Sequence, residues 1–154
     1  RCQDVVVSIS LFQAINHLIQ VSRGAVVPVN APRIVYFAHM QFMGKTEGGL
    51  LVDDRFFAMP GGPGTPALQT ELNKRGNLPL RQPLPAQAYP QFKLRSELGA
   101  IEDAWAKLGS LPEAEIANAV RGDRTAWART YDRNRVVAIS DRAIFEEFLW
   151  LHDA

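Results

Sequence analysis

The sequence predicts a mainly α-helical fold, in a single compact domain covering residues 1–154, with a small β-hairpin near residues 50–59. Two observations lead to this prediction. Apolar residues recur at steps of three and four along most of the chain, which is the spacing of a helix face packed on a core. Prolines and glycines lie between these segments, where they begin or end helices. The length and the 47% hydrophobic content suit one domain with a proper core.

The first two helices are predicted in residues 4–22 and 31–43. The first has an apolar face made of Val7, Leu11, Ile15, Leu18 and Val21. The second is apolar around most of its circumference and should therefore lie at the centre of the core. Asn30 is expected to cap the second helix, with Pro32 in its first turn and Gly44 at its end.

A hairpin and a short helix are expected next. Two extended pieces flank the acidic pair Asp53-Asp54, which is predicted to form the turn. The glycine- and proline-rich stretch "PGGPGTP" follows, and we expect it to be a rigid turn, because proline lacks the N–H that would bind an anion. Thr65 should cap a helix that runs from Pro66 to a stop at Gly76.

Residues 77–92 contain four prolines and no hydrophobic period. This composition is typical of an extended connector, so the segment is predicted to be flexible and to face a partner. Two of its larger apolar side chains, Leu84 and Tyr89, are candidate partner contacts.

Short helices are predicted in the second half of the chain. The first carries an apolar stripe, with Ser96 as its cap and Gly109 as its stop: Leu98, Ile101, Trp105 and Leu108. A helix from Pro112 to Gly122, another within "RTAWARTYDR", an extended "RVVAI" and a last helix capped by Ser140 or Asp141 complete the chain.

The composition limits the possible functions. The net charge of +1 predicts neither a nucleic-acid binder nor a protein that seeks an acidic surface. A single cysteine, Cys2, allows no disulfide within the chain and suits a reducing cytoplasm, which is the expected location. The longest apolar runs are far shorter than the roughly twenty residues of a membrane span, and the start does not read as a signal peptide.

A catalytic or cofactor-binding site is not predicted. The "GKT" at residues 44–46 lacks the earlier glycine of a phosphate-binding loop, where His39 stands, and it follows a predicted helix rather than a strand. The three histidines lie on separate predicted helices without metal-ligand spacing. His39 is expected to be a core residue, and adjacent carboxylates such as Glu146-Glu147 are expected to be mostly solvated. An enzyme would need His39 and Asp53 or Asp54 to meet in an open cleft, and this acidic pair is also the one place to check for a cation.

Six arginines occur between residues 121 and 142: Arg121, Arg124, Arg129, Arg133, Arg135 and Arg142. Three aspartates interleave with them, which favours a surface of Asp–Arg pairs and disfavours direct nucleic-acid binding. A DNA-binding autorepressor remains the alternative function, and it would need this region to form one continuous basic face.

Three segments resemble the Panacea domain. The helix "PRIVYFAHM" is similar to that family's "KLxYxA" helix, and "FFAMPGGPGTPALQTEL" is similar to its "xxAWxxGPVxPxxxxxL" segment. The stretch that contains "TAWARTYDR" resembles the family's closing pattern. The matching positions of most interest are Tyr36, Ala58, Gly62, Pro63 and Trp127.

The resemblance implies a non-catalytic antitoxin. Panacea antitoxins neutralise bacterial or phage toxins by direct contact, and one branch delivers the toxin to the ClpXP protease. The implied partners are therefore a cognate toxin protein and, in the adaptor form, ClpXP. Besides Leu84 and Tyr89, the candidate partner contacts are Trp127, Arg129 and Tyr131, because Trp, Tyr and Arg most often anchor interfaces.

Overall fold

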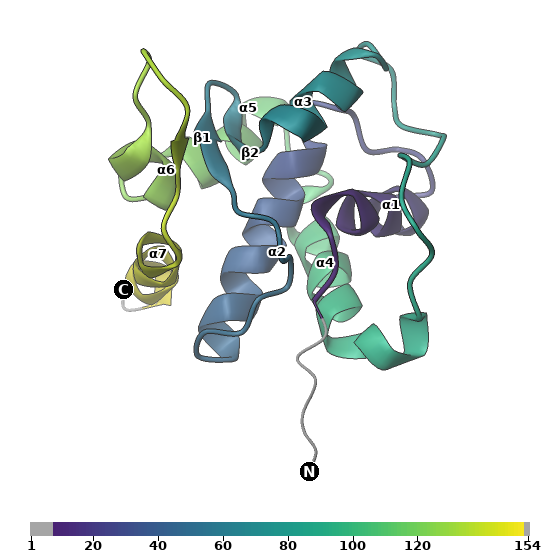
Figure 1. The fold of residues 1–154 in the computed structure, drawn as a ribbon, viewed down its shortest axis with the longest axis horizontal. Helices are drawn as coiled ribbons and strands as arrows, with labels where there is room; N and C mark the ends of the chain where they lie inside the picture. Colours follow the sequence, from purple (N-terminus) through teal and green to yellow (C-terminus); the bar gives the residue numbers. More distant parts are fainter. Residues whose placement is uncertain (1–7, 153–154) are drawn as a thin grey trace.

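A central helix, α2 (Ala31–Lys45), contacts most of the other elements (Figure 1). The structure is a computed structural model that describes residues 8–152. Most of α2 is buried, and its fully enclosed residues include Ile34, Tyr36 and Met40. The mainly helical fold and the central place of this segment are therefore confirmed.

Both ends of α2 differ from the prediction. The Asn30 side chain makes no capping hydrogen bond, and its backbone has helical angles (φ −90°, ψ −21°) where a cap is usually extended. Gly44 lies inside the helix, which ends at Lys45 with Thr46 as the residue after it. Packing explains the glycine, because the Phe148 ring would overlap a Cβ at this position.

Two helices pack on one side of α2, to its right in Figure 1. They are α1 (Leu11–Val21) and α4 (Arg95–Leu108), which also contact each other. The stripe predicted for α4 faces the core, although Trp105 is only partly buried. Gly109 follows the helix as predicted, whereas Leu94 rather than Ser96 precedes it.

The helix α1 begins later than predicted. It starts at Leu11, after a capping box in which the Ser10 hydroxyl accepts a hydrogen bond from the chain. Ile9 is extended and forms a parallel bridge with Val52. Residues 8–10 therefore precede the helix, and the rest of the predicted start, residues 4–7, lies outside the described residues.

The β-element is a three-stranded antiparallel sheet in the order β2-β1-β3. Its strands are β1 (Phe57–Met59), β2 (Gly62–Gly64) and β3 (Val137–Ala138). In this register Ala58 faces Pro63 on one side and Val137 on the other.

The hairpin turn was predicted at the wrong place. It lies at Pro60 and Gly61, between β1 and β2, rather than at the acidic pair. Gly62 makes this turn possible through its positive φ of 134°. The acidic pair binds the start of the chain instead, since Asp53 N–H donates to the Ile9 carbonyl (2.9 Å) and Asp54 Oδ1 accepts from Leu11 N–H (2.7 Å).

The short helix α3 (Pro66–Asn73) follows the hairpin as predicted. The Thr65 hydroxyl caps it by accepting a hydrogen bond from Leu68 N–H (3.1 Å). Gly76, with φ 68°, turns the chain three residues after its end.

Of the last three helices, α6 and α7 lie to the left of α2 in Figure 1, and α5 lies behind the hairpin, in contact with α2. They are α5 (Glu113–Arg121), α6 (Ala126–Thr130) and α7 (Asp141–His152), and the Ser140 hydroxyl caps α7 as predicted. Within the described residues, no helix is both long and apolar enough to cross a membrane.

The proline-rich segment 77–92 is docked on the core rather than facing outward. Leu80 and Leu84 are both buried, and Leu80 N–H donates to the Val26 carbonyl (2.8 Å). The Asn16 side chain on α1 binds both the N–H and the carbonyl of Leu84 (2.7 and 2.9 Å). A side-chain amide thus replaces the regular backbone partners that this segment lacks.

Candidate partner-binding surface

Three of the predicted partner contacts come together on α6. Trp127, Arg129 and Tyr131 lie within five residues, and α6 is fixed at its start by two side chains. The Thr125 hydroxyl accepts from Ala128 N–H (3.1 Å), and the Glu147 carboxylate accepts from Ala126 N–H (2.9 Å). Even a helix of one turn is thereby held in a defined orientation.

An aromatic pair forms the centre of this surface. The Trp127 and Tyr131 rings stack, with centroids 4.5 Å apart and planes inclined by 14°. Trp127 Nε1 donates to the Met59 carbonyl at the end of β1 (2.6 Å), so this ring also ties α6 to the sheet. Arg121 places its guanidinium 5.8 Å from the centroid of the Trp127 ring. We call Arg121, Trp127, Arg129 and Tyr131 the α6 surface.

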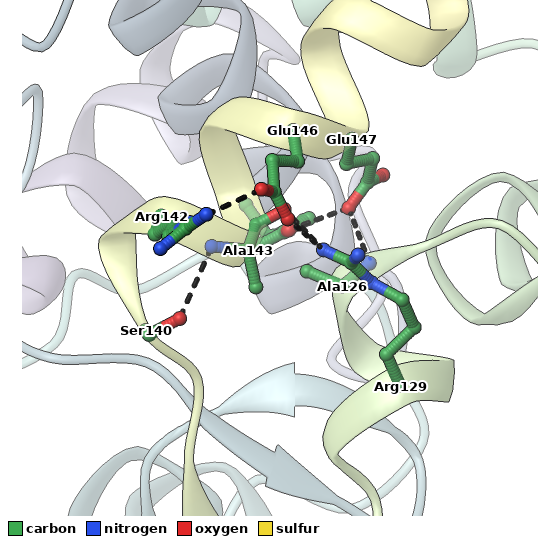
Figure 2. Close-up of polar contacts among 8 residues, drawn as sticks. Ala126, Arg129, Ser140, Arg142, Ala143, Glu146 and Glu147 are labelled. Carbon is green, nitrogen blue, oxygen red and sulfur yellow. Dashed lines mark hydrogen bonds and ion pairs between the residues drawn. The ribbon is translucent and has the colours of Figure 1, made fainter.

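Arg129 sits in a small charge network beside the pair (Figure 2). It donates to Glu146 (3.0 Å), which also accepts from Arg142 (3.2 Å). Hydrogen bonds from Arg129 and Arg142 lower the pKa of the Glu146 carboxyl. All three side chains reach solvent, so the network orients the Arg129 guanidinium and adds little to stability.

A buried carboxylate lies beneath this network. Glu147 is only 2% exposed, and its Oε1 accepts from both Tyr36 O–H (2.7 Å) and Ala126 N–H. Its Oε2 is buried and has no hydrogen-bond partner among the described residues. Burial raises the pKa of Glu147 and, together with the nearby carboxylate, raises that of Tyr36.

The five positions that match the Panacea pattern form two linked contacts. Tyr36 is linked to Trp127 indirectly: its hydroxyl donates to Glu147, and Glu147 accepts from the N–H of Ala126, the residue before Trp127. Ala58, Gly62 and Pro63 build the hairpin that supplies the carbonyl acceptor of Trp127. These positions therefore shape and hold the α6 surface from below.

Two arginines hold the tip of this hairpin. Arg33 is buried, and its Nε donates to the Gly61 carbonyl (2.9 Å), while Arg121 donates to the Pro60 carbonyl (3.2 Å). Burial and the neighbouring Arg121 lower the pKa of Arg33, and Glu113, 3.9 Å away, partly offsets them. The "PGGPGTP" stretch thus turns the chain, as predicted, and its Pro60 and Gly61 carbonyls accept hydrogen bonds from the two guanidinium groups.

Leu84 and Tyr89 do not belong to the α6 surface. The segment that carries them passes along α1, on the opposite side of α2 in Figure 1. The Leu84 side chain is enclosed in the core and cannot contact a partner in this conformation. Tyr89 is partly buried, with its ring edge-on to His17 at 6.1 Å.

His39 lies in the core beside Phe56, with ring centroids 5.0 Å apart. Its Nδ1 accepts a hydrogen bond from Val52 N–H (3.2 Å), and burial lowers its pKa to about 4. A neutral ring that accepts at Nδ1 carries its proton on Nε2, so neither nitrogen is free to act as a base. His39, Asp53 and Asp54 line a hollow of only about 90 Å³. No group of three metal-ligating side chains occurs in the described part of the chain.

Glu147 and Arg33 are the residues that the sequence analysis missed. Glu147 was grouped with Glu146 as a solvated carboxylate, yet it lies three residues after the buried Ile144 on the same face of α7. That spacing is the one signal that could have revealed it. Arg33 is enclosed by a hairpin that is distant in sequence, and no local pattern indicates this.

Comparison of the chain with protein-family models, with curated proteins and with solved structures found no match.

Proposed function

We propose that this chain is an antitoxin that binds and neutralises a cognate toxin protein in the cytoplasm without catalysis of its own. The observation that supports this most is the α6 surface. It presents Trp, Tyr and Arg together, the residue types that dominate the energetics of protein interfaces. The same helix and hairpin carry the residues on which the Panacea resemblance rests.

The rigidity of this surface supports the same proposal. Capping by Thr125, the bond from Ala126 to Glu147 and the bond from Trp127 to Met59 all fix α6 before a partner arrives. A surface that is already ordered loses less conformational entropy on binding. The partly exposed faces of Tyr131 and Arg129 are the contacts that we expect a toxin to use.

The DNA-binding alternative has less support from the geometry. Arg129, Arg135 and Arg142 are each in an ion pair, and Arg121 and Arg124 lie against tryptophan rings. Arginines held in this way do not form one continuous basic face. The five-residue α6 is also too short to act as a recognition helix.

Co-expression with the product of the adjacent gene tests the proposal, with growth and pull-down scored together. We expect the wild-type chain to restore growth and to retain the toxin, and the Tyr131→Ala and Arg129→Ala variants to lose both. Leu78→Ala is the matched control, because Leu78 is an exposed apolar residue of the 77–92 segment. A neighbour that is harmless and does not bind would contradict the antitoxin function.

Delivery to ClpXP is the adaptor form of this proposal, and a degradation assay separates it from simple masking. Purified toxin is incubated with ClpXP, with and without this chain. Faster loss of toxin when the chain is present indicates delivery, whereas protected toxin indicates masking. Salt-dependent binding of the chain to its own promoter would instead favour the autorepressor.

A further inference from the structure

A second candidate binding feature adjoins Glu147 and the start of α6. The end of α5, residues 122–125 and the last turns of α7 enclose a hollow of about 410 Å³. Glu147, Trp150 and Leu151 line it from α7, and Asp123 and Arg124 line it from the loop before α6, with the Arg124 guanidinium 5.0 Å from the centroid of the Trp150 ring. Trp150 and Leu151 are 44% and 40% exposed, a large apolar area for the end of a helix.

The free oxygen of Glu147 indicates what this pocket binds. Oε1 is fully used by Tyr36 and Ala126, whereas Oε2 is buried without a partner and points away from Arg129 and Ala126 in Figure 2. A buried carboxylate oxygen without a donor is costly, and a cation that reached it would remove that cost.

The chain's own arginines leave this oxygen unbound. Arg129 donates to Glu146, and Arg124, which lines the same pocket, lies over the Trp150 ring at 5.0 Å. The position of Arg124 also shows that the Trp150 ring accepts a guanidinium against its face. Arg124 is exposed, so solvent screens its charge, whereas Glu147 is buried.

We propose that this pocket binds an arginine side chain of a partner protein, with the guanidinium donating to Glu147 Oε2 and its plane against the Trp150 ring. Arginine suits the pocket better than lysine, because one planar group can both donate to a carboxylate and stack on an indole. The inference rests on the proposed function in one respect, that the partner is a protein. The binding of a guanidinium group in the pocket does not depend on the proposed function.

The test uses the full chain and a small probe, Nα-acetyl-argininamide, followed by the NMR signal of the Trp150 indole. We expect a saturable shift with a Kd on the order of 1 mM, as suits one anchored side chain. The neutral isostere Nα-acetyl-citrullinamide should bind at least about tenfold more weakly, because it lacks the charge. Equal binding of both probes, or no binding of either, would overturn the proposal.

Matched variants assign the binding to Glu147. Glu147→Gln should weaken the arginine probe about tenfold or more, whereas Glu146→Gln, a neighbouring exposed carboxylate, should change it less than about twofold. Circular dichroism is the check that Glu147→Gln remains folded. Trp150→Leu replaces an exposed side chain and leaves the core intact, and it should also weaken binding of the arginine probe. Because this variant lacks the Trp150 indole, its binding is followed by the NMR signal of a backbone amide in residues 122–125. Unchanged affinity in Glu147→Gln would refute the assignment.

The probe experiment and the co-expression experiment can fail separately. Loss of probe binding with intact neutralisation would refute the pocket and leave the antitoxin function standing. Probe binding without any toxin rescue would support the pocket and contradict the antitoxin function.

Discussion

Acidification should destabilise this protein through His39, and the size of the effect follows from the burial of the ring. The pKa of His39 falls from 6.5 to about 4 in the folded state, because burial disfavours the charged form. Between these two pH values the unfolded chain binds a proton that the folded chain does not bind. Stability therefore rises with pH across this window and is lost as the pH falls from about 6.5 toward 4.

The magnitude can be worked out from the two pKa values. A difference of one pKa unit corresponds to about 1.36 kcal/mol, so the full effect of His39 is roughly 3 kcal/mol. Between pH 7 and pH 4.5 the expected loss is about 2 kcal/mol, since the folded form begins to take up the proton near the lower end. This is a large share of the stability of an ordinary domain.

Urea unfolding at a series of pH values measures this effect, with His39→Asn as the comparison. The asparagine Oδ1 can accept the hydrogen bond from Val52 N–H that Nδ1 accepts now, but it does not titrate in this range. The difference in unfolding free energy between wild type and variant should change by about 2 kcal/mol between pH 7 and pH 4.5. Carboxylates contribute equally to both proteins and cancel. Parallel pH profiles for the two proteins would show that His39 is not buried as described.

Three further substitutions test the packing. Gly44→Ala should destabilise the protein by about 1–3 kcal/mol, although alanine normally favours a helix, because the new Cβ would overlap the Phe148 ring. Gly99→Ala on α4, where the space around the glycine is open, should instead stabilise it by about 0.5–1 kcal/mol. Thermal unfolding of the two variants compares these effects. Equal effects at the two glycines would contradict the placement of Phe148. Leu84→Ala should cost about 2–4 kcal/mol in urea unfolding, as for a core leucine, and a cost below about 0.5 kcal/mol would mean that the 77–92 segment is not docked.

Sequence reasoning succeeded where the signal is local. The apolar circumference of α2, the Thr65 cap of α3 and the Gly109 stop of α4 each depend on residues within one or two turns. Such short-range patterns report directly on helix geometry and on the backbone groups left free at helix ends. The fold class follows from them because most of the chain consists of such segments.

The failures beyond the ends of the helices involve contacts between distant parts of the chain. The proline-rich segment 77–92 looked like an exposed connector, because nothing in its composition shows that Asn16 on α1 binds the backbone of Leu84. The acidic pair looked like a turn, because its bond to Leu11 N–H spans 43 residues. Gly44 looked like a helix end, because its close neighbour Phe148 lies on the last helix.

The sequence predicted residues of the α6 surface, but not the contacts that hold α6 in place. Trp127, Arg129 and Tyr131 could be chosen by residue type, since these types anchor interfaces. The sequence did not show that the Glu147 carboxylate of α7 holds the start of α6 and also accepts a hydrogen bond from the Tyr36 hydroxyl on α2.

Glu147 therefore belongs both to the core and to the proposed partner site, and the two roles act on each other. Burial raises its pKa, so the folded chain favours the protonated form more than an exposed glutamate would. A guanidinium at Oε2 favours the carboxylate, and a carboxylate accepts stronger hydrogen bonds from Tyr36 O–H and Ala126 N–H than a neutral acid does. Binding in the pocket should therefore tighten the two bonds that hold α6 in place, so that one partner contacting both features would bind them cooperatively.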